Sequence, residues 1–443
     1  MVPLILAKLF FQLPINEQAK NQTAKPPHLI MVEDRATSSI QLIQPSNIDY
    51  VRWFLPPSKS HMIRWLLLAS MSKNNTRISF SGKLGEDILS MARCLEQLGV
   101  KIGKNEGYWE VEGKGPNGFI LPEEVLDCRN SGTTMRFLLP QVACFSSTVI
   151  LDGDWTLRKR HLESSTNSIE GLGATIQMNN VNSGAPYSIC GPLHPGTISL
   201  DTSNSSQSLS ALVLLGPRMS GPITIETKGR PVSNRHAALT FDIANKTGSN
   251  VIWEEGKNFT IEPWTPICPE NVIIPSDLSL AAFGIVAATV HNSNLEIVNP
   301  PDPKDGIGAE IIFDIIEKKS TKSIELDLLN CNDLLPALTA YLALGPGGRI
   351  INAAHARFKE SNRISKTIEM LSHFGLQVKE CADGIQTEGG QIPKMPDEIV
   401  DVYGDHRLFM TAACIASKTG GKLTDKGIWR ITDPSFPQQI GFK

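Results

Sequence analysis

One pattern of apolar and polar residues recurs at four places along the 443-residue chain. At each place, a stretch with the apolar spacing of an amphipathic helix ends at a glycine, and two short alternating stretches follow. The alternation predicts two strands after each helix, and each glycine suits a helix C-cap, which requires a left-handed backbone. The segments are 91–113, 167–191, 241–262 and 368–389, and their glycines are Gly99, Gly173, Gly248 and Gly375.

The interval before the last copy is longer and contains a degenerate copy. A further amphipathic helix is predicted over Ile311–Lys318, and the strand-like stretch SIELD follows it at 323–327. A repeated unit that holds helices and several strands is larger than the units of solenoid proteins. The pattern therefore predicts an α/β (α+β) protein built from a few similar subdomains packed around pseudo-symmetry axes.

The length predicts two domains, because a single hydrophobic core rarely serves so many residues. Joints rich in proline lie near 55–58 and 263–275. We therefore expect one lobe over 57–275 and a second lobe formed by 38–56 together with 276–443. Residues 1–37 have no basic segment or cleavage site typical of a secretory signal, and we expect a poorly ordered N-terminal extension.

Composition excludes several classes of function. The 42 basic and 45 acidic residues give a net charge of −3, which argues against a nucleic-acid partner. The eight cysteines are scattered without CxxC pairs, so we expect free thiols in a cytoplasmic protein. Neither a metal nor an organic cofactor is indicated, and no apolar stretch is long enough to span a membrane. We expect a monomer that acts on small molecules.

Four helix starts combine small hydroxyl residues with a following apolar helix, at 55–70, 130–140, 202–215 and 231–241. Free N–H groups and the helix dipole attract anions at such starts. Ordinary N-capping explains each serine equally well when it is taken singly. Four such starts in one chain favour anion binding. The candidate residues are Lys59, Ser60, Arg64, Gly132, Ser205, Ser206, Gln207 and Ser233.

Charged residues gather in three segments of the C-terminal half. Asp333 opens an otherwise apolar helix, where N-capping is again an alternative. Arginine forks match the geometry of carboxylate and phosphate groups, and a carboxylate at a cleft can transfer protons. The other two segments, 355–364 and 402–417, contain Lys359, Glu360, Arg363 and Arg407.

Taken together, these segments resemble the 5-enolpyruvylshikimate-3-phosphate synthase family in order and spacing, over about residues 40 to 437. The motifs are PPSKSHMIR, NSGTTMR, SSQSLSAL, SDLSLAAF, CNDLLPAL, FKESNRI and GDHR. The resemblance implies a two-lobed fold in which each lobe has three βαβαββ units related by pseudo-threefold symmetry. It also implies transfer of the enolpyruvyl group of phosphoenolpyruvate to the 5-hydroxyl of shikimate 3-phosphate.

The resemblance implies a role for each candidate. Catalysis would fall to Asp333, Glu360 and Lys59. Shikimate 3-phosphate would be bound by Lys59, Ser60, Arg64, Ser205, Ser206, Gln207, Ser233, Asp333 and Lys359. Phosphoenolpyruvate would be bound by Lys59, Gly132, Arg160, Gln207, Arg363 and Arg407.

The chain departs from the family pattern near its C-terminus. Pro434 stands where the family carries a lysine that contacts phosphoenolpyruvate, and Arg430 or Lys422 is a candidate replacement. Two alternatives therefore remain, namely a transferase that acts on another phosphorylated acceptor and a non-catalytic paralogue. A UDP-N-acetylglucosamine enolpyruvyl transferase is disfavoured, because its catalytic cysteine is missing from 153–161.

Overall fold

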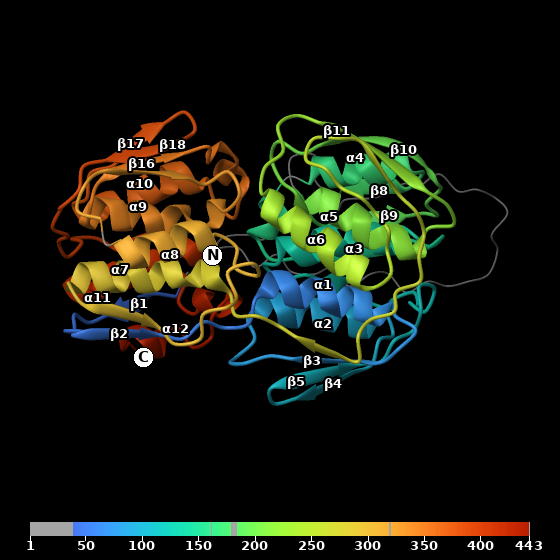
Figure 1. Ribbon diagram of the computed structural model, residues 1–443, viewed down its shortest axis with the longest axis horizontal. Coiled ribbons are helices and arrows are strands. Elements are labelled where there is room, and N and C mark those ends of the chain that lie inside the picture. The colour runs from blue at the N-terminus through green and yellow to red at the C-terminus, as the bar shows by residue number, and fades with distance from the viewer. Residues whose placement is uncertain (1–38, 161, 179–183, 319, 443) are drawn as a thin grey trace, which may run out of the picture.

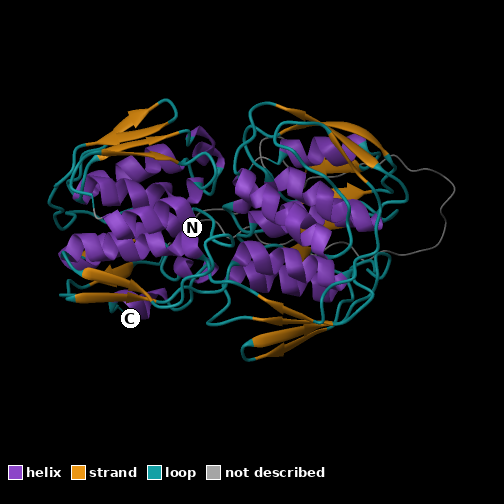
Figure 2. Cartoon of the chain, viewed as in Figure 1, coloured by secondary structure: helices purple, strands orange, loops and turns teal. Residues whose placement is uncertain are grey.

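The computed structural model describes residues 39–160, 162–178, 184–318 and 320–442, and it consists of two lobes that lie side by side (Figure 1). The predicted extension at 1–37 lies outside the described residues. In both lobes, helices fill the interior and small sheets lie on the outside (Figure 2). The blue strands β1 and β2, at the start of the described chain, pack into the lobe formed by its C-terminal half.

Within the described residues, six helices form the interior of the first lobe. They are α1 (Lys59–Ser70), α2 (Glu86–Gln97), α3 (Gly132–Val142), α4 (Glu163–Gly171), α5 (Gln207–Leu215) and α6 (Asn234–Lys246). Three sheets cover them. The first has the spatial order β13 (Asn271–Ile273), β3 (Thr76–Ser79), β5 (Tyr108–Val111) and β4 (Ile102–Asn105). The second has the order β6 (Leu126–Asp127), β7 (Val149–Asp152), β9 (Tyr187–Cys190) and β8 (Thr175–Met178). The third has the order β10 (Gly196–Asp201), β11 (Ile223–Lys228) and β12 (Phe259–Ile261).

The second lobe repeats this plan. Its helices are α7 (Ala281–His291), α8 (Ala309–Lys318), α9 (Leu335–Leu344), α10 (Arg363–His373), α11 (His406–Thr419) and α12 (Phe436–Ile440). Its sheets are β14 (Asn294–Ile297) with β2 (Tyr50–Trp53); β15 (Ile324–Asp327), β16 (Gly348–Ile351), β18 (Gly384–Thr387) and β17 (Lys379–Cys381); and β1 (Gln41–Ile43) with β19 (Gly421–Leu423).

The internal repeat is visible in the strand pairing. The sheets that begin with β13, β6 and β15 each have one parallel pair followed by two antiparallel pairs. The β10–β11–β12 sheet has the same parallel and antiparallel pairs but lacks the fourth strand. The four predicted C-cap glycines all have positive φ, between 75° and 105°. Side chains would be strained there, which explains why the repeat keeps glycine.

The prediction of two strands after Gly248 is wrong for the first of them. Only β12 forms, and the residues around Val251 are irregular. The Val251 N–H donates to Ser249 Oγ (3.2 Å), and Asn245 Nδ2 donates to the Val251 carbonyl (3.1 Å). Side chains therefore satisfy the backbone groups that a neighbouring strand would otherwise need.

Helices that carry apolar residues on every side, such as α5, α7 and α9, lie at the centres of the lobes, as expected when no face can be left in water. The buried apolar residues form two clusters. One runs from Met62 to Ile274, and the other joins Ile43–Leu55 to Leu278–Phe442. Among the described residues, no helix combines the length and apolar character needed to cross a membrane.

The chain passes between these clusters at two places that lie against each other. The Ser58 N–H donates to the Pro275 carbonyl at 2.8 Å, and the Asp277 N–H donates to the Pro56 carbonyl at 2.8 Å. These bonds form a short antiparallel ladder around Pro57 and Ser276. Both crossings lie next to the start of α1, which carries Lys59, Ser60 and Arg64.

Candidate active site

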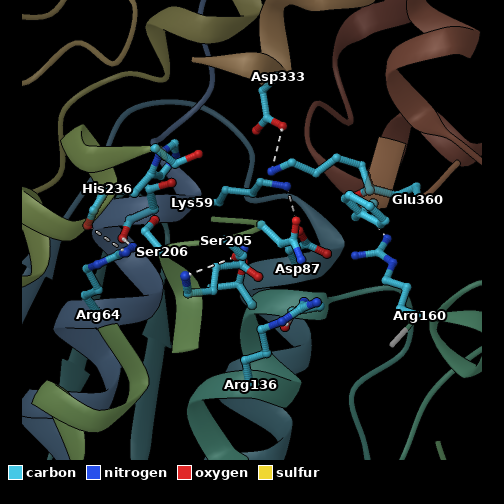
Figure 3. Close-up of a pocket in the computed structure, with 18 residues that line it drawn as sticks. Lys59, Arg64, Asp87, Arg136, Arg160, Ser205, Ser206, His236, Asp333 and Glu360 are labelled. Atoms are coloured by element: carbon cyan, nitrogen blue, oxygen red, sulfur yellow. Dashed lines mark hydrogen bonds and ion pairs between the residues drawn. The ribbon is translucent and has the colours of Figure 1, made fainter. Parts of the chain in front are cut away.

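A pocket of about 780 Å³, including its open mouth, is lined by residues of both lobes (Figure 3). Twelve of the fourteen predicted site residues line it, although they come from widely separated parts of the chain. They are Lys59, Ser60, Arg64, Gly132, Arg160, Ser205, Ser206, Gln207, Ser233, Asp333, Lys359 and Glu360.

The hydroxyl groups at two of the helix starts are not used as caps. Ser206 precedes α5 and Ser233 precedes α6, yet neither side chain makes a capping hydrogen bond. By contrast, Ser131 caps α3 by accepting a hydrogen bond from the Thr134 N–H. The capping explanation therefore holds for Ser131 and fails for Ser206 and Ser233. Both serines line the pocket, where their hydroxyls can donate to an anion.

Gln207 connects two of these helix starts. Its Nε2 donates to Thr133 Oγ1 at 3.0 Å, and its backbone N–H donates to Ser205 Oγ at 3.1 Å. The first turns of α3 and α5 are thereby held side by side. Gln207, like the three serines and Gly132, lines the pocket.

Ser233 has a left-handed backbone, with φ of 55°. The segment is held by bonds that cross between the lobes. The Ser233 N–H donates to the Leu329 carbonyl at 2.9 Å, and the Asn234 N–H donates to Asn330 Oδ1 at 3.0 Å. Such strain in a residue other than glycine persists only where surrounding contacts fix the backbone. The contacts of the second lobe thus help to set the position of this serine.

Lys59 and Arg64 project from α1 into the same pocket. Lys59 Nζ lies 2.8 Å from Asp87 Oδ2, at the start of α2. Arg64 is 1% exposed and donates to Thr240 Oγ1 (2.7 Å) and to the backbone carbonyls of Ser60 (2.7 Å) and His236 (3.1 Å). All of these acceptors are neutral, and burial lowers the pKa of Arg64 to about 9. An uncompensated buried cation favours the binding of an anion nearby.

The wall formed by the second lobe is a network of carboxylates and cations. Arg363 lies at its centre and is 1% exposed. It donates to Asp333 Oδ1 (2.6 Å), to Glu360 Oε2 (2.5 Å) and to Asp405 Oδ2 (2.8 Å). Arg407 donates to the Asp333 carboxylate and backbone carbonyl, at 3.2 and 3.0 Å. Neither Arg363 nor Arg407 lines the pocket, so both stand behind the carboxylates that do.

Two of these carboxylates have strongly shifted pKa values. Burial alone would raise the pKa of Asp333, but Arg407, Lys359 and Arg363 lower it well below its usual value. Burial acts in the same way on Glu360, and Arg160 and Arg363 lower its pKa well below the usual value. Both groups are therefore ionised near neutral pH when no substrate is bound.

Glu360 also joins the two lobes. Arg160 Nη2 lies 3.0 Å from Glu360 Oε1 (Figure 3). Gly132 lies beside the same guanidinium group, because a Cβ there would meet Arg160 Nη1 at 2.4 Å. Glycine is therefore required at this place for Arg160 to occupy its present position.

Six further residues line the pocket and were missed by the sequence analysis as site residues: Asp87, Thr133, Arg136, Asn204, His236 and Phe358. Arg136 lies four residues after Gly132, as Arg64 lies four residues after Ser60. That spacing places each arginine one turn into its helix, and it could have identified Arg136. Asp87 has no such signal, because acidic residues are common in first turns.

The residues of the C-terminal departure have other neighbours in the structure. Pro434, Arg430 and Lys422 are not among the residues that line this pocket. Lys422 pairs with Leu42 in the β1–β19 sheet, and Arg430 stacks near Trp429. The geometry thus gives no support to either residue as a replacement cation. The described residues also contain no group of three or more His, Cys, Asp and Glu side chains arranged to hold a metal ion.

Comparisons with known proteins place this architecture in a family. The family model described as EPSP synthase (3-phosphoshikimate 1-carboxyvinyltransferase) matches residues 54–440. The 3-phosphoshikimate 1-carboxyvinyltransferase of Methanobrevibacter smithii is 30% identical to this chain over 416 residues, which covers 86% of this chain and 93% of that protein. The enzyme of the same name from Sulfurihydrogenibium sp. is 31% identical over 416 residues, covering 86% and 94%.

The fold agrees with a solved structure. The EPSP synthase from Acinetobacter baumannii matches with a TM-score of 0.68 and 23% sequence identity, covering 91% of this chain and 97% of that one. This likeness confirms the two-lobed α/β fold predicted from the sequence. Because the family model covers most of the chain and the relatives are matched over nearly their whole length, the chain belongs to the EPSP synthase family.

Proposed function

We propose that the interlobe pocket is where this chain carries out the family's reaction. The chain is a 3-phosphoshikimate 1-carboxyvinyltransferase, a transferase of the shikimate pathway and of aromatic amino acid biosynthesis. It transfers the enolpyruvyl group of phosphoenolpyruvate to the 5-hydroxyl of shikimate 3-phosphate and releases phosphate. One observation carries the assignment of the pocket. The hydroxyls of Ser206 and Ser233, which do not cap their helices, lie across the pocket from a buried network of carboxylates and arginines.

The acceptor occupies the side of the pocket formed by α1, α5 and α6. Ser205, Ser206 and Ser233 donate to its phosphate, and Ser60 and Arg64 lie next to them. Gln207 lies between the two substrates. Asp333 and Lys359, whose carboxylate and ammonium groups lie 3.5 Å apart, bind its ring hydroxyls from the second lobe. Hydroxyl donors and an arginine without a carboxylate partner support this placement.

Phosphoenolpyruvate occupies the opposite side, next to Gly132. Lys59 and Arg160 contact it directly. Arg363 and Arg407 reach it when they exchange part of their contacts with the carboxylates for contacts with the substrate. Two anionic substrates repel each other, and these cations bring them together in one site.

The chemistry requires three proton transfers, two in opposite directions during addition and one during elimination. The acceptor hydroxyl loses its proton as its oxygen forms a bond to C2 of phosphoenolpyruvate, and the methylene carbon C3 gains a proton. In the second step C3 loses a proton, the C2–O bond to phosphate breaks and the enol ether forms. Asp333 lies beside the hydroxyl and Glu360 beside C3, where each moves a proton. Lys59 and the arginines stabilise the charge on the leaving phosphate.

The test is phosphate release from phosphoenolpyruvate, with shikimate 3-phosphate compared against other phosphorylated acceptors and unphosphorylated shikimate. Turnover should require shikimate 3-phosphate. Faster turnover with another acceptor would identify a specialised transferase. A folded protein that binds both substrates without turnover would be a non-catalytic paralogue.

The serines give the first testable prediction. Replacing Ser205 and Ser233 by alanine together should raise the KM for shikimate 3-phosphate far more than the KM for phosphoenolpyruvate. Each hydrogen bond to a charged phosphate contributes about 1.5–3 kcal/mol, although neighbouring contributions need not add. Steady-state kinetics with each substrate varied in turn measures the split. Equal rises in both KM values would show that the serines only shape the helix starts.

The two lobes divide the work of binding. The lobe of 57–275 binds mainly shikimate 3-phosphate, and the lobe of 38–56 with 276–443 supplies Asp333, Glu360 and arginines for phosphoenolpyruvate. The two separate apolar clusters support this division. We also propose that the enzyme acts as a monomer, since one chain supplies both walls of the pocket, and that it is cytoplasmic, in keeping with its scattered cysteines.

A further inference from the structure

The pocket contains one arginine whose hydrogen-bonding capacity is largely unused. Arg136 projects from α3 into the pocket and is 8% exposed (Figure 3). A guanidinium group carries five N–H donors. Among the described residues, Arg136 makes one hydrogen bond, from Nη1 to the Gly132 carbonyl at 3.2 Å, and it has no carboxylate partner.

The other arginines around the pocket differ from Arg136 in this respect. Arg160 pairs with Glu360, and Arg363 and Arg407 both pair with Asp333. Arg64 has no carboxylate partner either, but it donates to side-chain and backbone oxygens on three sides. Arg136 is thus a buried cation whose charge and donors the surrounding protein leaves largely unsatisfied, an arrangement that is costly unless a ligand completes it.

The position of Arg136 indicates which ligand completes it. A Cβ on Gly132 would lie 2.9 Å from Arg136 Nη1 and 2.4 Å from Arg160 Nη1. Both guanidinium groups therefore converge beside Gly132, on the wall of the pocket that all three residues line. Two like charges so close repel each other, and the pKa of Arg136 is lowered to about 10, mainly by burial and then by Arg160. An anionic group bound between the two forks would remove both penalties.

From this geometry we propose that Arg136 is a substrate-binding residue that, together with Arg160, holds an anionic group of phosphoenolpyruvate in the space next to Gly132. The inference rests on the proposed placement of phosphoenolpyruvate beside Gly132. It adds to that placement a second guanidinium fork from the first lobe. Shikimate 3-phosphate lies on the serine side of Gln207 and is not contacted by Arg136.

The experiment compares Arg136→Gln and Arg136→Lys with the wild-type enzyme. Arg136→Gln should raise the KM for phosphoenolpyruvate by about 10- to 100-fold, the scale of one charged hydrogen-bonded contact. The KM for shikimate 3-phosphate should change by less than about twofold, because Arg136 does not contact that substrate. A general loss of structure would instead raise the KM values for both substrates. Arg136→Lys keeps the charge but loses the fork, and we expect an intermediate KM for phosphoenolpyruvate.

Arg218→Gln is the matched control. Arg218 is also a partly buried arginine, and burial lowers its pKa. It donates to the Gln141 carbonyl at 2.6 Å but does not line the pocket. Its replacement should lower the melting temperature and leave both KM values unchanged. Calorimetric titration of each protein with phosphoenolpyruvate, in the presence of shikimate 3-phosphate, measures binding independently of turnover.

The outcomes separate this inference from the proposed function. If the wild type turns over shikimate 3-phosphate and Arg136→Gln raises neither the KM nor the Kd for phosphoenolpyruvate, the inference is wrong and the function stands. If Arg136→Gln raises the KM for shikimate 3-phosphate instead, Arg136 belongs to the acceptor side. If the wild type binds phosphoenolpyruvate without turnover, calorimetry still decides the role of Arg136.

Discussion

Replacing Glu360 by glutamine should lower kcat by about 10²- to 10⁴-fold, the usual contribution of a positioned proton-transfer group. Glutamine keeps the size and the hydrogen-bond acceptor but cannot carry the proton. Single-turnover measurements of product formation should show the loss directly, with little change in the KM for shikimate 3-phosphate. Glu380→Gln is the matched control, since Glu380 pairs with Arg357 at 2.6 Å outside the pocket. A variant that retains at least half of wild-type kcat would exclude Glu360 from proton transfer.

The electrostatics of Glu360 predict a second measurable effect. In the structure, Arg160 and Arg363 hold its pKa well below the usual value, which suits a carboxylate and not an acid. When an anionic substrate competes for these arginines, the same carboxylate loses much of its stabilisation, and its pKa must rise. We therefore expect net proton uptake when phosphoenolpyruvate binds to the complex with shikimate 3-phosphate.

Titration calorimetry in buffers with different ionisation enthalpies measures this uptake. The wild type should take up a fraction of a proton at pH 6 to 7, and Glu360→Gln should take up less. Equal uptake in both proteins would assign the proton to another group, such as Asp333 or the phosphate of the substrate.

Replacing Arg363 by methionine should have the largest effect on stability. Its guanidinium contacts three carboxylates, those of Asp333, Glu360 and Asp405. Removing one partner of a buried ion network leaves charges without compensation, which typically costs about 3–5 kcal/mol. Urea unfolding followed by fluorescence should show a much lower midpoint, and turnover should be lost as well. Arg357→Met is the control, because its pair with Glu380 is partly exposed and should contribute at most about 1 kcal/mol.

The difference in stability between the wild type and Arg363→Met should depend on pH, which gives an internal check. Asp333 and Glu360 have lowered pKa values in the folded state, so their contribution to stability is present above their unfolded pKa of about 4. It is lost as the pH falls through the lowered folded values. The wild type and Arg363→Met should therefore differ most near pH 7 and converge in acid. A difference that stays constant down to pH 3 would show that lost packing, and not lost charge pairing, destabilises the variant.

The fold was predictable from the sequence where one residue type carries a strong backbone requirement. Gly99, Gly173, Gly248 and Gly375 marked the ends of four helices because positive φ excludes most other residues. The irregular segment near Val251 was not predictable in this way. Its apolar alternation is that of a strand, but local side chains, and not a neighbouring strand, satisfy its backbone.

The site was predictable as far as chemistry repeated a local motif. Hydroxyl-rich helix starts indicated Ser205, Ser206 and Ser233 because several of them occurred together. The pairing of charged groups behind the pocket was not predictable, since the spacing along the chain does not tell whether Arg363 contacts a substrate or a carboxylate. Arg136 was missed for a similar reason. Its spacing from Gly132 was a signal in the sequence, but its lack of a carboxylate partner is visible only in three dimensions.

The two crossings between the lobes have a mechanical consequence. The bonds from Ser58 to Pro275 and from Asp277 to Pro56 tie the crossings into one narrow ribbon. Because both crossings lie in this ribbon, the described chain connects the two lobes covalently at one place. An opening of the cleft that keeps these bonds intact therefore pivots about this ribbon. The contacts of Ser233 with Leu329 and of Arg160 with Glu360 span the two lobes, so a swing about this ribbon separates both pairs. In the proposed placement of the substrates, one of these contacts lies at each substrate, and opening therefore loosens both binding sites together.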